Sequence, residues 1–105
     1  MPSVADPTPS AVALPAVLTQ HEARSALAQL LQALALPGRQ PAGQTLVLDG
    51  QALQRFDSTT LAVLLECRRE ALQRGHSLRV QALPDGLWKL AGLYGVQGLL
   101  DPHHA

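Results

Sequence analysis

The sequence predicts a single α/β domain in which helices pack on a mixed β-sheet of three to four strands. Segments with strand patterns and segments with helix patterns alternate along the chain, an order typical of layered α/β folds. Residues 45–49 form a continuous apolar run of the kind found in a covered interior strand. The length of 105 residues and the apolar content of 47% fit one domain with a modest core.

The predicted domain covers residues 10–100. Residues 1–9 hold Pro2, Pro7 and Pro9 among small side chains, so we expect a flexible lead-in there. Residues 101–105 are expected to form a C-terminal tail.

The first strand and the first helix are predicted within residues 11–37. Residues 11–18 are apolar, but Pro15 removes a backbone donor, which indicates a weak or edge strand. Thr19 and Glu22 have the spacing of a capping box at a helix start. An apolar stripe at helical spacing follows, and Pro37 ends the helix.

The second half of the chain repeats the alternation. After the strand at residues 45–49, a helix is predicted from about Ser58 to Arg74, with Gly75 ending it. Residues 77–83 alternate between apolar and polar side chains, the pattern of a strand with one buried face. A third helix is predicted from residues 84–86 to about Gly95.

Composition argues against several classes of function. Lys and Arg number 8, as do Asp and Glu, so a basic nucleic-acid surface is not expected. The single cysteine, Cys67, can form no internal disulfide. No segment approaches the roughly 20 apolar residues that span a bilayer, and the N-terminus lacks a signal-peptide pattern. We therefore expect a soluble cytoplasmic protein.

No arrangement of residues suggests catalysis. His21 and His76 have no Cys, Asp or Glu at metal-ligand spacing, and Cys67 has no activating base nearby in the sequence. No glycine-rich phosphate loop occurs. The sequence thus predicts neither enzymatic activity, nor a cofactor, nor a metal.

Four polar residues bunch at the start of the second helix: Asp57, Ser58, Thr59 and Thr60. One interpretation is structural, because Asp57 or Ser58 can cap the free amides of the first turn. The other is a functional surface, since a helix N-terminus presents hydroxyls and stabilises anions. A phosphate on Ser58 would meet the positive end of the helix dipole but would crowd Asp57.

The helix that follows is apolar nearly all round in its first two turns. We expect a core-facing stripe formed by Leu61, Leu64, Leu65 and Leu72. We expect the opposite side to carry Ala62, Val63 and Cys67. An exposed apolar patch beside polar cap residues indicates a docking site, although single exposed Ala and Val side chains can also be without consequence. Trp88, on the flank of the third helix, is either part of such an interface or a lid on the core.

These segments resemble STAS domains, the family that includes sulfate-transporter tails and anti-sigma-factor antagonists. The resemblance lies in residues 46–49 and 56–65, and covers the motif Asp-Ser-(Ser/Thr)-Gly-Leu. Asp57, Ser58 and Thr59 match that motif, whereas Thr60 replaces its glycine. The serine of this motif is the phosphorylation site in the antagonists, so the resemblance makes Ser58 a possible phosphorylation site.

Residues 87–96 further resemble the last helix of the small STAS subunits of bacterial phospholipid (Mla) ABC transporters. That resemblance implies an accessory subunit that binds the cytoplasmic ATPase subunit and is peripheral to the inner membrane through it. It also implies that Asp57 and Ser58 form the contact pair. Two alternatives stay open: an anti-sigma-factor antagonist switched at Ser58, and a small-ligand or lipid-binding protein. We expect the partner surface to comprise Asp57, Ser58, Thr59, Thr60, Ala62, Val63, Cys67 and Trp88.

Overall fold

The computed structural model describes residues 11–34, 43 and 45–100 of the chain. Predictions about the lead-in, the Pro37 helix end and the C-terminal tail lie outside these residues. In chain order the elements are β1 (Ala11–Ala13), β2 (Val17–Leu18), α1 (Ala23–Ala33), β3 (Thr45–Asp49), β4 (Arg55–Phe56), α2 (Ser58–Gln73), β5 (Ser77–Gln81), α3 (Asp85–Leu93) and α4 (Gln97–Leu100). The predicted α/β fold is confirmed, as are the strands and helices expected at 45–49, 58–74 and 77–83 to within a few residues.

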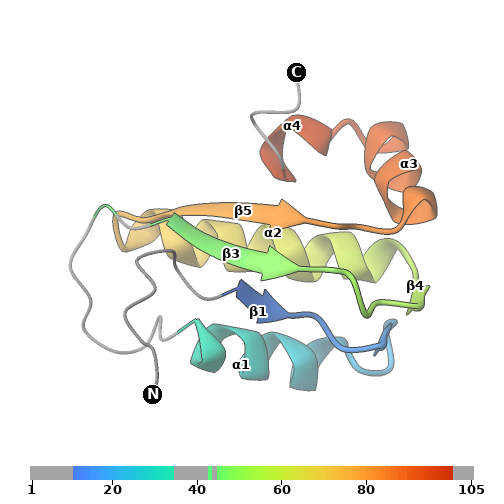
Figure 1. Cartoon of the computed structure of the whole chain (residues 1–105), viewed down its shortest axis with the longest axis horizontal. Helices are drawn as coiled ribbons and strands as arrows, with labels where there is room; N and C mark the ends of the chain where they lie inside the picture. Colours follow the sequence, from blue (N-terminus) through green and yellow to red (C-terminus); the bar gives the residue numbers. More distant parts are fainter. Residues whose placement is uncertain (1–10, 35–42, 44, 101–105) are drawn as a thin grey trace, which may run out of the picture.

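The main sheet has three parallel strands in the order β1-β3-β5, so β3 lies at its centre (Figure 1). In its register Leu46 pairs with Leu78 and Leu48 with Val80. β2 and β4 form a separate parallel pair. Neither β4 nor α4 was predicted, because two-residue and four-residue elements carry too few residues for a periodic pattern.

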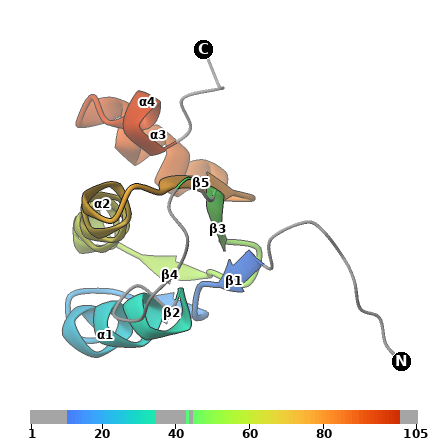
Figure 2. The same cartoon turned by 90° about the vertical axis from the view of Figure 1, so that its left-hand side faces the viewer.

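The helices α1 and α2 lie on the same side of the sheet (Figure 2). The alternation of β5 follows from this arrangement: Leu78 and Val80 are buried, whereas Arg79 and Gln81 are exposed. In the described part of the chain the sheet therefore buries one face. Parallel sheets are usually covered on both faces, so the polar face of this sheet is a departure from the common pattern.

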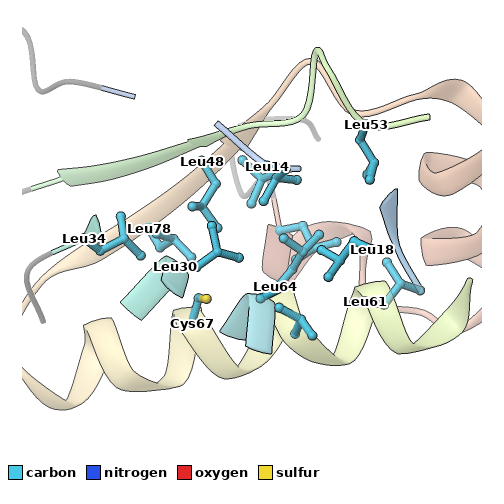
Figure 3. Close-up of a cluster of buried hydrophobic side chains, with 14 of the residues drawn as sticks. Leu14, Leu18, Leu30, Leu34, Leu48, Leu53, Leu61, Leu64, Cys67 and Leu78 are labelled. Atoms are coloured by element: carbon cyan, nitrogen blue, oxygen red, sulfur yellow. The ribbon is translucent and has the colours of Figure 1, made fainter. Parts of the chain in front are cut away.

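The core fills the space between the sheet and these two helices (Figure 3). Leu48 from β3 and Leu64 from α2 are fully buried, and Leu14 from the β1–β2 connection is 1% exposed. Each such leucine contributes on the order of 2 kcal/mol when it leaves water. Leucines fill this layer at these positions, whereas a pocket of about 220 Å³ lies between β1 and α1, with Val12, Ala26 and Leu30 in its lining.

The break between β1 and β2 falls at Pro15, and β1 forms one edge of the sheet, as predicted. The expected pairing of Thr19 and Glu22 is present, but in a different form. The Thr19 amide and the Thr19 hydroxyl both donate to the Glu22 carboxylate, at 2.8 and 2.6 Å. These hydrogen bonds lower the pKa of Glu22, and α1 begins one residue later, at Ala23.

Candidate functional site

The start of α2 is closed by a reciprocal capping box. Asp57 is the N-cap residue, and its carboxylate accepts from the Thr59 amide at 2.9 Å. The Thr60 hydroxyl accepts from the Asp57 amide at 3.0 Å. The second Asp57 carboxylate oxygen accepts from the Gln20 amide at 3.1 Å, which links α2 to the turn before α1. Capping therefore accounts for two of the four polar side chains that the sequence places here, Asp57 and Thr60, since Thr59 contributes only its backbone amide.

Thr60 does not belong to an exposed surface, so its inclusion in the partner surface was wrong. Its side chain has no exposure, and its hydroxyl donates to the Leu18 carbonyl oxygen of β2. A glycine, as the STAS motif has at this position, could make neither this bond nor the bond to Asp57. The threonine ties the helix start to the small β2–β4 sheet.

Thr59 is half-buried, and Ser58 is the exposed member of the cluster. It occupies the first position of α2, and its hydroxyl has no hydrogen-bond partner among the described residues. It lies at an open groove of about 340 Å³ between α2 and the α3–α4 turn. The rest of its lining is apolar except for the Tyr94 hydroxyl, and consists of Leu61, Ala62, Leu65, Tyr94 and Val96. We call these six residues the Ser58 groove.

The α3–α4 turn supplies the far wall of the Ser58 groove because Gly95 reverses the chain there. Gly95 has a φ of 72°, a left-handed conformation that glycine adopts without steric cost. The Val96 amide then donates back to the Ala91 carbonyl oxygen at 2.9 Å, which places Val96 beside α2. Tyr94, just before the turn, stays 60% exposed. The sequence analysis missed Tyr94 and Val96, and Gly95 after an apolar helix was the available signal.

The assignment of α2 faces was partly wrong. Val63 and Cys67 were expected on the outer side, but they are 4% and 0% exposed. Leu72 was expected in the core, but it is 47% exposed. The true contact line has the helical spacing i, i+4, i+7, i+11 and consists of Thr60, Leu64, Cys67 and Ala71.

The physical reason is that α2 has neighbours on more than one side. It packs on β5, against α1, and against α3 and α4, so Val63 and Leu61 on its two flanks are buried as well. Small side chains on the central line let the helix approach the sheet closely, and leucines at the edge of the contact stay partly in water. The prediction took the leucines as the markers of the core face. It therefore placed that face on the wrong side of α2.

Ala62 is exposed on α2, as predicted. One turn further on, the outer surface of the helix becomes charged, since Arg69 Nε donates to the Glu66 carboxylate at 3.1 Å. This contact lowers the pKa of Glu66. The apolar surface next to Ser58 therefore ends after about two turns of α2.

Trp88 is half-buried and does not reach the Ser58 groove. It lines a second groove of about 300 Å³ beside β5, together with Arg79, Leu83 and Asp85. The structure therefore separates the predicted surface into two places, one at Ser58 and Ala62 and one at Trp88.

The described residues hold no group of three or more His, Cys, Asp or Glu side chains that could bind a metal ion. Burial raises the pKa of the Cys67 thiol to about 12, which keeps the thiol protonated at neutral pH. Within residues 11–34 and 45–100, no helix is long and apolar enough to cross a membrane.

Comparison with known proteins identifies one family. The family model described as "Mlab, STAS domain" matches residues 4–101, nearly the whole chain. No curated protein and no solved structure matches the chain.

Proposed function

The chain belongs to the STAS domain family, and from that premise we propose that it is a non-catalytic accessory subunit of a bacterial phospholipid ABC transporter. In this proposal it binds the transporter's cytoplasmic ATPase subunit and supports its assembly or activity. The protein would then be cytoplasmic and held at the inner membrane through its partner. The Mlab description of the matching family model and the resemblance of residues 87–96 support this choice within the family.

The observation that carries the proposal is the Ser58 groove. A mainly apolar surface with the hydroxyl-bearing side chains of Ser58 and Tyr94 suits an apolar side chain of a partner, with hydrogen bonds to fix its direction. Leu93 and Leu99, which flank the α3–α4 turn in the chain, are 83% and 41% exposed, so this segment carries further exposed apolar side chains. Exposed apolar patches of this kind mark interaction sites more often than they serve the folded monomer.

Asp57 acts in this proposal by positioning Ser58. Its carboxylate oxygens already accept from two backbone amides, and this capping fixes the first turn of α2. Ser58, with its exposed hydroxyl, is the contact residue of the pair.

A matched pair of alanines in exposed helix positions tests the proposal. Ala62→Glu places a carboxylate in the Ser58 groove, whereas Ala28→Glu places the same group on the exposed surface of α1. Each variant is co-expressed with the ATPase subunit of the phospholipid transporter of the same organism. We expect the ATPase to co-purify with the wild type and with Ala28→Glu but not with Ala62→Glu, because binding would bury an unpaired carboxylate.

Circular dichroism of Ala62→Glu separates lost docking from lost folding. If the wild type retains no ATPase, or if folded Ala62→Glu retains as much as Ala28→Glu does, the proposed docking at this groove is wrong.

The exposed, unbonded hydroxyl of Ser58 favours one second candidate, the anti-sigma-factor antagonist. A phosphate on Ser58 would lie at the N-terminus of α2, where the helix dipole stabilises an anion. Incubation with the anti-sigma kinases of the same organism, followed by mass spectrometry, tests it. Phosphate on Ser58, and its loss in Ser58→Ala, would favour this candidate over the transporter subunit.

A further inference from the structure

β5 is an edge strand in the described part of the chain, because the only strand that pairs with it there is β3. The Gln81 carbonyl oxygen accepts from the Gly50 amide at 2.8 Å, so the backbone of Gln81 points toward β3. Backbone groups of successive strand residues point to opposite sides. The amide and carbonyl of Val80 therefore point away from β3, toward the free edge.

The backbone of Val80 has no hydrogen-bond partner among the described residues. Val80 as a whole residue is only 5% exposed, so its side chain is buried in the core and only a small part of the residue reaches the groove that it lines. A strand fixed by its side chain with an unpaired amide and carbonyl at its edge is a ready template for another strand.

The free edge opens on the second groove, whose lining includes Val80 itself. Figures 1 and 2 show α3 and α4 beyond β5, on the side away from β1. Trp88 and Asp85 from α3 thus form one wall, and the edge of β5 forms the other. A groove between an edge strand and a helix is the geometry in which extended peptides add to a sheet, with backbone bonds on one side and side chains on the other.

Two charged residues are among those that line this groove. Arg79 in β5 and Asp85 at the start of α3 are both exposed, and neither forms an ion pair with a described residue. The half-buried Trp88 and Leu83 also line the groove and present apolar surface. The complementary segment carries an acidic residue at Arg79, an apolar residue at Trp88 and a basic residue at Asp85.

We propose that the β5–α3 groove is a second docking site, which takes a short extended segment of a partner protein as an added strand beside Val80. The groove shares no residue with the Ser58 groove. The inference is therefore independent of which partner binds at Ser58.

Phage-displayed random dodecapeptides, selected on the full-length chain, provide the probe. We expect the enriched peptides to share the acidic–apolar–basic pattern. Fluorescence polarisation of synthetic peptides then measures the dissociation constant. Methylating the one peptide amide that donates to the Val80 carbonyl should weaken binding roughly tenfold, the value of about one hydrogen bond, while methylating the next amide should not.

Variants of the chain locate the site. Arg79→Glu should weaken the binding of peptides that carry the acidic residue roughly tenfold, because an attraction is lost and a repulsion is gained. Arg24→Glu, the same change at an exposed position on α1, should leave the dissociation constant unchanged. Ala62→Glu in the Ser58 groove should also leave it unchanged.

Several outcomes would overturn the inference. The first is that no peptide is enriched in the selection. The second is that methylation weakens binding equally at both neighbouring amides. The third is that Ala62→Glu abolishes peptide binding whereas Arg79→Glu retains it. Sedimentation that shows a dimer of the chain dissociated by Arg79→Glu would assign the edge to a second copy instead. None of these outcomes bears on whether the ATPase co-purifies.

Discussion

The hydroxyl of Thr60 donates to the carbonyl oxygen of Leu18, a residue 42 positions earlier in the chain. Since the same hydroxyl accepts from the Asp57 amide, one buried side chain satisfies two backbone groups from separate segments. The first turn of α2 is thereby fixed to β2. Ser58, in the same first turn, is exposed.

Thr60→Val should destabilise the domain by about 2–3 kcal/mol, because it leaves the Asp57 amide and the Leu18 carbonyl without their partner in the interior. Thr60→Ser keeps the hydroxyl and should cost about 1 kcal/mol, roughly one buried methyl group. Urea unfolding of both variants measures the difference. Equal losses in the two variants would show that the hydroxyl contributes little.

Val63→Glu should unfold the domain, whereas Ala62→Glu should remain folded, although the two residues are neighbours. Val63 is 4% exposed, and burying an unpaired carboxylate costs several kcal/mol. Ala62 is exposed, so its glutamate stays in water. Circular dichroism of both variants checks this, and a folded Val63→Glu would contradict the face assignment of α2.

Ala82→Gly should stabilise the protein by up to about 1 kcal/mol. Ala82 has a φ of 58°, a left-handed conformation that costs a non-glycine residue roughly 1–2 kcal/mol. The greater freedom of glycine in the unfolded chain offsets about 0.5–1 kcal/mol of that gain. Ala82→Val should destabilise, because a branched side chain fits this conformation worse still. The urea concentration at the unfolding midpoint should be highest for Ala82→Gly, intermediate for the wild type and lowest for Ala82→Val.

The Cys67 thiol should be unreactive in the folded protein. Burial raises its pKa from 9.0 to about 12, so almost none of the nucleophilic thiolate is present at pH 8. Labelling with a thiol reagent at pH 8 should be slow in buffer and fast in concentrated urea. Labelling in buffer at the rate of a free thiol would contradict the burial of Cys67.

The same pKa shift predicts a dependence of stability on pH. The folded state holds the thiol proton more tightly than the unfolded chain does, so this contribution is complete below about pH 9 and declines as the pH rises toward 12. The loss of unfolding free energy between pH 8 and pH 11 should therefore be smaller in Cys67→Ala than in the wild type. Urea titrations of both proteins at the two pH values provide the comparison.

Local patterns in the sequence were enough to predict the order and approximate bounds of the longer strands and helices, although not the short β4 and α4. The run at residues 45–49, the alternation after Ser77 and the polar start of the second helix are local signals, readable from spacing alone. Asp57 as a helix cap was predictable for the same reason, since a cap bonds to amides within its own first turn. The STAS family was also readable from these segments.

Which side of α2 faces the core depends on how the helix packs against its neighbours. Leucine spacing pointed to Leu65 and Leu72, but Cys67 and Ala71 lie on the contact line because α2 packs against several elements at once. The burial of Thr60 depends on Leu18, which the chain brings to it from 42 residues away. Each groove is lined by residues from different helices and strands. These residues come together through tertiary packing, which cannot be predicted from local sequence periodicity.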